Sequence, residues 1–208
     1  MQLALFDLDH TLIPADSDHA WGQFLVRQGE VDAEQFAAAN DRFYQQYCDG
    51  TLDIQAYLRF ALAPLARIDP SRLHALQIAF MQECIEPIIK PQALELLRRH
   101  QARGDVCVLI TATNEFVTAP IARRLGIAHL IACEVEQIEH RYTGMPKGIA
   151  SFREGKVIRL LQWIEAELQD RETRPNDAQS LACEVQTQLS REHPAPKPAQ
   201  RLLSRATF

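Results

Sequence analysis

Three short, largely apolar runs lie at wide intervals along the chain, and each is typical of a buried parallel strand. They cover residues 3–6, 106–110 and 130–135. Parallel neighbours in a sheet need a crossover connection, which is usually helical. The spacing of the runs therefore predicts an α/β protein with a doubly wound sheet.

Between these runs, apolar residues recur every three to four positions, as they do on one face of a helix. Predicted helices of this kind cover residues 92–103, 114–125 and 156–168. Gly104 and Gly126 are typical helix stops, whereas Pro120 predicts a kink or a later start of the second helix. Residues 136–152 contain alternating and turn-forming positions, which predict a β-hairpin or an irregular flap.

Residues 18–86 show only helical periodicity, so a long helical insert separates the first predicted strand from the second. The pattern changes again after Gln169, where the chain becomes polar and then proline-rich. Because no apolar run remains there that could form another strand, we expect residues 169–208 to be a poorly ordered tail.

Composition excludes several classes of partner. The 208 residues carry 22 Lys and Arg against 27 Asp and Glu, a net charge of -5, so no broad basic field is available for nucleic acid. No apolar stretch approaches the roughly 18 residues of a membrane-spanning helix, and Asp7 and Asp9 interrupt the region where a secretory signal would be apolar. We therefore expect a soluble, cytoplasmic protein without nucleic-acid or membrane partners. The five cysteines form no CxxC pair and are expected to be reduced thiols, with Cys107 and Cys133 in the core.

Two acidic residues, Asp7 and Asp9, follow the first predicted strand and precede Thr11 and Leu12. Buried carboxylates this close repel each other unless a proton or a cation lies between them, and Mg2+ prefers such oxygen ligands. The alternative is an ordinary strand-to-turn junction, in which the aspartates accept backbone N–H bonds. The position directly after an apolar strand favours the functional interpretation.

Two further positions could complete a phosphate site. Thr111 ends the second predicted strand before a helix, where a hydroxyl and backbone N–H groups can hold a phosphate oxygen. A helix cap at Thr113 or Asn114 is the ordinary alternative. Lys156 opens the last predicted helix, where a cation opposes the helix dipole and so suggests a function. Lys147 is a rival for that role, and a surface lysine is the plain alternative.

Together these residues resemble the haloacid dehalogenase-like (HAD) hydrolase superfamily, and within it subfamily IB, the phosphoserine-phosphatase-like branch. The first motif of that branch, Asp-x-Asp-x-Thr-Leu, is matched in full by residues 7–12. Thr111 matches the second motif, a hydroxyl at a strand end, and Lys156 matches the third. The resemblance covers residues 1–168.

The resemblance implies a Rossmann-like, doubly wound parallel sheet core with an inserted all-helical cap domain. The core would comprise residues 1–16 and 87–168, the cap residues 17–86, and residues 169–208 would be atypical. Such a cap closes over the site, excludes water and recognises the leaving group. Candidates for that recognition, each better explained by packing or solvation, are Asp16, Asp18, Trp21, Tyr57 and Arg59.

The implied mechanism is covalent. Asp7 would attack phosphorus to form an aspartyl-phosphate, while Asp9 would protonate the leaving alcohol and later deprotonate the attacking water. Thr111 and the backbone N–H of Ala112 would bind phosphoryl oxygens, and Lys156 would neutralise charge on Asp7 and on the phosphoryl group. Mg2+, held by the Asp7 carboxylate and the Asp9 carbonyl, would let an anionic nucleophile approach an anionic substrate.

A fourth motif, which in the family supplies further Mg2+ carboxylates after another strand, is not found in the sequence. Asn176 and Asp177 resemble it only superficially, because no strand pattern precedes them. A reading frame shifted near residue 170, or a truncated product, is the hypothesis that explains the abrupt change. The loss predicts weak metal affinity and an uncovered strand edge, which favours a homodimer, strand exchange or aggregation.

The sequence therefore predicts a Mg2+-dependent phosphatase acting on a small phosphorylated metabolite that is phosphoserine-like or histidinol-phosphate-like. A catalytically impaired or non-catalytic protein that binds phosphate or a partner is the alternative, favoured by the missing motif. A phosphoacceptor switch is a third interpretation, against which the long helical insert argues.

Overall fold

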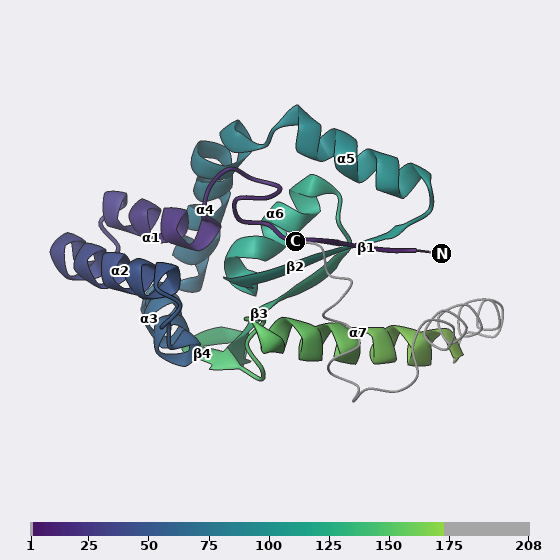
Figure 1. The fold of residues 1–208 in the computed structure, drawn as a ribbon. Coiled ribbons are helices and arrows are strands. Elements are labelled where there is room, and N and C mark those ends of the chain that lie inside the picture. Colours follow the sequence, from purple (N-terminus) through teal and green to yellow (C-terminus); the bar gives the residue numbers. More distant parts are fainter. Residues whose placement is uncertain (1, 173–208) are drawn as a thin grey trace.

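The first predicted strand, β1 (Leu3–Phe6), pairs in parallel with β2 (Val106–Asn114) in the computed structural model of the chain (Figure 1). β2 in turn pairs in parallel with β3 (His129–Ile138), and β4 (Arg141–Lys147) pairs antiparallel with β3. The strand order is β1-β2-β3-β4. The structure describes residues 2–172. Three parallel strands form as predicted, and the expected hairpin adds β4 as an antiparallel arm.

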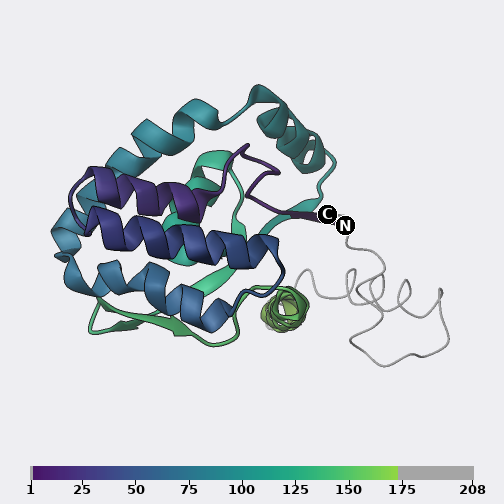
Figure 2. The ribbon, with the colours of Figure 1, turned by 60° about the vertical axis from the view of Figure 1, so that its left-hand side comes forward.

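The stretch between β1 and β2 is helical, as its periodicity predicts. It comprises α1 (Ser17–Arg27), α2 (Ala33–Cys48), α3 (Ile54–Arg67), α4 (Pro70–Phe80), a π-helical turn (Met81–Ile85) and a 3-10 turn (Glu86–Ile88). An aspartate side chain accepts a backbone N–H bond at the start of each of the four α-helices, which stabilises the helix start. These caps are Asp16, Asp32, Asp53 and Asp69. In Figure 2, α1, α2 and α3 lie side by side as one layer.

The remaining helices are α5 (Pro91–Ala102), α6 (Glu115–Leu125) and α7 (Glu154–Glu172). Pro120 does not delay the start of α6, which begins directly after its cap. A proline lacks the N–H that would bond the carbonyl four residues earlier, here that of Phe116. The side-chain amide of Gln77, on α4, donates to that carbonyl at 2.7 Å instead. A residue far away in the sequence thus satisfies the group that Pro120 leaves free.

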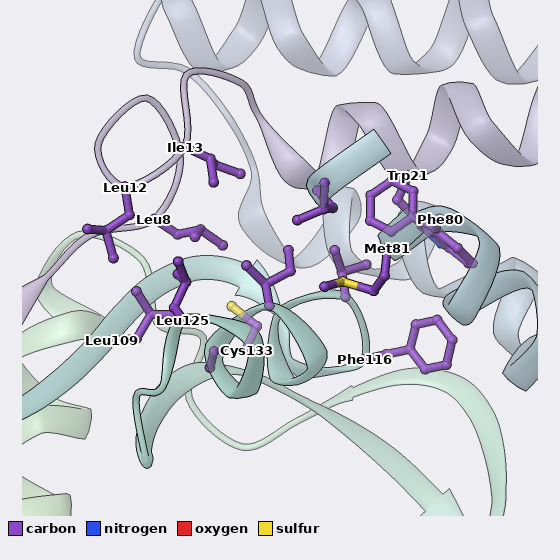
Figure 3. Close-up of a cluster of buried hydrophobic side chains, with 14 of the residues drawn as sticks. Leu8, Leu12, Ile13, Trp21, Phe80, Met81, Leu109, Phe116, Leu125 and Cys133 are labelled. Carbon is purple, nitrogen blue, oxygen red and sulfur yellow. The ribbon is translucent and has the colours of Figure 1, made fainter. Parts of the chain in front are cut away.

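Helices cover both faces of the sheet, so the doubly wound α/β prediction is confirmed. One face packs Val108, Ile110 and Ile131 against Leu160 of α7, which runs along the opposite side of the sheet from α6 (Figure 1). The other face shares a large core with the helical insert. Figure 3 shows part of that core, with Trp21, Phe80 and Met81 from the insert and Leu109, Phe116, Leu125 and Cys133 from the α/β part. Cys107 and Cys133 are buried thiols, as predicted.

Several expectations concern the end of the chain. α7 continues to Glu172, past the predicted end of regular structure at Gln169. The remainder of the predicted tail, with the superficial fourth motif at Asn176 and Asp177, lies outside the described residues. Within residues 2–172, β1 is one end of the strand order. No helix in that part of the chain is long and apolar enough to span a membrane.

Candidate active site

The turn after β1 places two acidic side chains on one pocket. The backbone carbonyl of Leu8 accepts three hydrogen bonds, and Leu8 itself is fully buried, which anchors the turn. The three donors, at 3.2, 2.9 and 3.1 Å, are the N–H groups of Thr11, Leu12 and Ile13. His10 takes a left-handed conformation with φ 55° so that the chain can reverse. Asp7 and Asp9 consequently both line the same pocket.

The Asp9 carboxyl group is held on both oxygens. The N–H of Ser17 donates to Oδ1 at 2.7 Å, and the Thr113 hydroxyl donates to Oδ2 at 2.8 Å. The Thr111 hydroxyl lies 3.4 Å from the same Oδ2. Burial raises the pKa of Asp9, as does the charge of Asp16, while the bonds from Ser17 and Thr113 lower it. A raised pKa favours the protonated form of this carboxyl group, which a general acid needs.

The end of β2 supplies the hydroxyl groups of the pocket. The strand extends beyond the predicted end at Ile110, so Thr111 lies within it. Thr111 and Thr113 share one side of the strand because side chains alternate, and both reach Asp9. Of the two residues predicted as possible helix caps, Thr113 and Asn114, it is Asn114 that caps α6. Ala112 lines the pocket between the two threonines.

Lys156 reaches the pocket from the first turn of α7. Its Nζ lies 3.1 Å from Asp7 Oδ1, and the two side chains are 15% and 28% exposed. The preceding Gly155 permits this turn, since a Cβ there would overlap the carbonyl oxygen of Ala150. The rival, Lys147, lies in β4 and does not line the pocket.

The helical insert forms the rest of the pocket wall. Among the five candidates for leaving-group recognition, Asp16, Asp18 and Tyr57 line the pocket, whereas Trp21 is buried in the core and Arg59 is exposed. Sequence reasoning missed the other wall residues of α1 and α2. These are His19, Asn40, Phe43, Tyr44 and Tyr47. Helical periodicity marks such positions as one face of a helix without distinguishing a core from a pocket.

The donor set suits a hard cation, although few protein ligands are present. Four aspartates line the pocket together with Lys156, and Asp7 offers a partly exposed carboxylate. Carboxylate and carbonyl oxygens are the ligands that Mg2+ prefers, and it commonly keeps several waters. Among residues 2–172, however, no three Asp, Glu, His or Cys side chains are gathered as a metal site. These residues would therefore bind a Mg2+ ion only weakly.

Comparison with known proteins decides the family. A sequence profile described as haloacid dehalogenase-like hydrolase matches residues 4–174. The chain belongs to this family. A histidinol-phosphatase from Neisseria meningitidis is 46% identical to this HAD-like hydrolase over 163 residues, which are 78% of the chain and 73% of that protein. Phosphoserine phosphatase SerB1 from Mycobacterium tuberculosis is 30% identical over 157 residues, 74% of the chain and 51% of that protein.

Solved structures agree with the fold of this HAD-like hydrolase. A protein of unknown function from Bordetella pertussis has a TM-score of 0.75 and 47% identity, with 80% of the chain and 75% of that protein covered. A substrate-bound phosphoserine phosphatase has a TM-score of 0.56 and 17% identity, over 80% and 71% of the two chains. The latter shows the fold alone. The predicted family and fold class are thus confirmed.

Proposed function

We propose that this chain is a Mg2+-dependent phosphatase that hydrolyses a small phosphate monoester through an aspartyl-phosphate intermediate. One observation carries the proposal: Asp7, Asp9, Thr111 and Lys156 come from three distant segments and line one pocket. Hydrolysis of phosphoric monoesters agrees with the family and with the names of the two relatives.

Asp7 is the proposed nucleophile. Its carboxylate attacks phosphorus, the bond from phosphorus to the ester oxygen breaks, and Asp9 gives its proton to the leaving oxygen. A water then attacks the aspartyl-phosphate, Asp9 takes the proton of that water, and inorganic phosphate leaves as the Asp7 carboxylate is restored. The raised pKa of Asp9 supports the first proton transfer, since the group must be protonated when the alcohol leaves.

The other residues stabilise charge on the phosphoryl group. Thr111 and the backbone N–H of Ala112 would bind phosphoryl oxygens, and Lys156, beside Asp7, would neutralise charge that both partners bring. The Asp7 carboxylate and the Asp9 carbonyl would hold Mg2+, which lowers the repulsion between an anionic nucleophile and an anionic substrate.

The substrate we favour is histidinol-phosphate-like, with a phosphoserine-like monoester as the second choice. The relative named as a histidinol-phosphatase supports the first. The pocket wall also combines Asp16 with the tyrosines at 44 and 47, a lining that suits a cationic or aromatic leaving group. We propose that residues 17–86 act as the cap over a core made of residues 1–16 and 87–168.

The decisive experiment measures phosphate release from histidinol phosphate, phosphoserine and p-nitrophenyl phosphate. The chain is assayed with Mg2+ and with a chelator, beside Asp7→Asn and Asp7→Ala. We expect Mg2+-dependent release that both substitutions abolish. Activity that survives in both variants would exclude Asp7 as the nucleophile.

A second candidate is a phosphate-binding protein without turnover. The observation that favours it is that no three Asp, Glu, His or Cys side chains are gathered as a metal site among residues 2–172. It predicts that phosphate binds, as measured by calorimetry, while none of the monoesters is hydrolysed at saturating Mg2+. Measurable turnover of any of them removes this candidate.

A further inference from the structure

Asp18 joins three elements from a buried position. It lies in the first turn of α1 and is only 7% exposed. Its Oδ2 accepts a hydrogen bond from the hydroxyl of Tyr57 on α3, and its Oδ1 accepts one from the side-chain amide of Asn114, both at 2.9 Å. Asn114 ends β2 and caps α6. The helical insert is thereby tied to the strand that carries the pocket hydroxyls.

Asn114, which donates to Asp18, is itself held in place by two hydrogen bonds. Its Oδ1 accepts the N–H of Val117 at 3.1 Å, and its backbone carbonyl accepts the hydroxyl of Thr118 at 2.9 Å. The amide Nδ2 is then the group left to face Asp18. Thr113, one residue earlier, donates to Asp9. The side chains that donate to Asp9 and to Asp18 therefore belong to adjacent residues, Thr113 and Asn114.

A second connection to Asp9 runs through α1 itself. Ser17, directly before Asp18, gives its N–H to Asp9 Oδ1 at 2.7 Å. Asp16, directly before Ser17, accepts the N–H of His19 at 2.9 Å and so caps the same helix. Neighbouring residues of a helix are rigidly spaced, so a displacement of Asp18 also displaces the Ser17 N–H.

We propose that Asp18 is a positioning residue, whose bonds to Tyr57 and Asn114 fix the start of α1 so that the Ser17 N–H aligns the Asp9 carboxyl group. The inference rests on the function proposed above. It differs from a role in binding, because Asp18 acts through Ser17 and needs no contact with the substrate.

The positioning role does not depend on a negative charge. Burial and the charge of Asp16 raise the pKa of Asp18 to about 7, so the neutral acid is a populated form at neutral pH. A neutral group can make the same two bonds, with one oxygen accepting from Asn114 and the other end donating to the Tyr57 oxygen. A carboxamide of the same shape has this capacity too.

The test compares Asp18→Asn with Asp18→Leu in the full chain, using p-nitrophenyl phosphate with Mg2+. A misplacement of about 1 Å at a reacting group costs up to about a hundredfold in rate. We therefore expect Asp18→Leu to lower kcat about ten- to a hundredfold while KM changes less than about threefold. Asp18→Asn should retain kcat within about threefold, because the bonds persist.

Two measurements keep the test decisive if Asp18→Leu folds poorly. Tyr57→Phe removes only one donor and should lower kcat about threefold. Hydrogen exchange of the backbone amides at the start of α1, followed by mass spectrometry in the free protein, should be faster in Asp18→Leu and Tyr57→Phe than in Asp18→Asn. Gln77→Leu is the matched control, since it removes another bond between the insert and α6 without approaching Asp9.

The outcomes separate the hypotheses. Wild-type kcat and exchange in Asp18→Leu and Tyr57→Phe would overturn the positioning role, as would a loss in Gln77→Leu as large as in Asp18→Leu. A loss of kcat in Asp18→Asn equal to that in Asp18→Leu would show that charge is required and would also overturn it. If the wild-type chain hydrolyses no monoester, the proposed function fails, whereas the exchange comparison still tests the bonds of Asp18.

Discussion

The two ends of the pocket are built in different ways. At the phosphate end, Asp7 follows β1, Thr111 lies near the end of β2, and Lys156 opens α7. Parallel strands bring such residues together because their carboxyl ends meet at one edge of the sheet. At the helical end, the wall comes from α1, α2 and α3, whose positions depend on side-chain packing.

This difference separates two kinds of specificity. In the proposed mechanism, the phosphate end carries groups that every phosphate monoester would meet, so its variants should change turnover for all substrates alike. The helical end would face the part of the substrate that varies, so its variants should change the ranking of substrates. The junction between the ends is Asp9, which accepts bonds from Ser17 on one side and from Thr113 on the other.

After the loss of Asp7 itself, the largest effect on activity should follow the loss of the pocket lysine. Lys156→Met removes the cation 3.1 Å from Asp7, so charge on the nucleophile and the phosphoryl group is no longer neutralised. We expect kcat to fall about 10²- to 10³-fold for every substrate that the wild type accepts, measured as phosphate release. Lys147→Met is the control, since that lysine lies in β4 away from the pocket, and it should keep wild-type kcat. An effect confined to one substrate would contradict the division between the two ends.

A pH-dependent stability should follow from the buried acid at the helical end. Burial, with the charges of Asp16 and Asp9, raises the pKa of Asp18 from 3.8 to about 7 against the opposing bond from Tyr57. Between about pH 4 and 7 the folded chain therefore binds the proton that the unfolded chain has lost, so this group's contribution to stability falls as pH rises.

Asp18→Asn cannot ionise, so its free energy of unfolding minus that of the wild type should rise between pH 4 and pH 7. The rise should be about 3 kcal/mol, since one pKa unit corresponds to about 1.4 kcal/mol. Urea unfolding at the two pH values measures it. A difference that stays constant with pH would show that folding does not raise the pKa of Asp18.

The phosphate end should also be sensitive to backbone fit. Gly155→Ala forces a Cβ onto the carbonyl oxygen of Ala150, and neither backbone group can yield cheaply. We expect a loss of about 2 kcal/mol in unfolding free energy, with reduced activity because Lys156 follows directly. Gly104→Ala is the comparison, since it has φ +76° but no heavy atom within 4 Å, and should cost about 1 kcal/mol. Gly155 has no positive φ, so a loss no larger than that of Gly104→Ala would mean that the backbone around position 155 shifts to accommodate the added Cβ.

The phosphate end was largely predictable because its information is local. An apolar run followed directly by Asp7 and Asp9 fixes a strand, its end and two carboxylates within a few residues. The end of β2 was predicted less well, since the apolar run stops at Ile110 whereas the strand continues. Had the strand been extended, alternation alone would have placed Thr113 beside Thr111.

The helical end was less predictable because its contacts are tertiary. Periodicity identifies the helices, yet it does not tell whether Tyr44 faces a core or a pocket. Pro120 likewise predicts a disturbed helix, and only the distant Gln77 explains why α6 tolerates it. Asp18 and Asn114 meet although 96 residues separate them, so neither sequence neighbourhood indicates the bond.

A moderate effect should follow the loss of the missed hydroxyl. Thr113→Val keeps the shape of the side chain but removes the 2.8 Å bond to Asp9 Oδ2. We expect kcat to fall about tenfold for all substrates, the loss that corresponds to about one net hydrogen bond. Thr143→Val, in β4, supplies the matched control, because its hydroxyl bonds Glu136 and not a pocket residue. An unchanged kcat would leave the Ser17 N–H as sufficient support for Asp9.

The smallest expected effect, that of Tyr44→Leu on KM, should differ most between substrates. Tyr44 lines the helical end of the pocket, and its ring centroid lies 5.8 Å from that of His19. Tyr44→Leu removes an aromatic face that an imidazole or ammonium group could meet, so KM for histidinol phosphate should rise about threefold. KM for p-nitrophenyl phosphate should rise less, and kcat should hold for both, because Asp7 and Lys156 are untouched. Tyr44→Phe keeps the ring and should behave as wild type; an equal rise in KM for both substrates would place the recognition of the leaving group elsewhere on the wall.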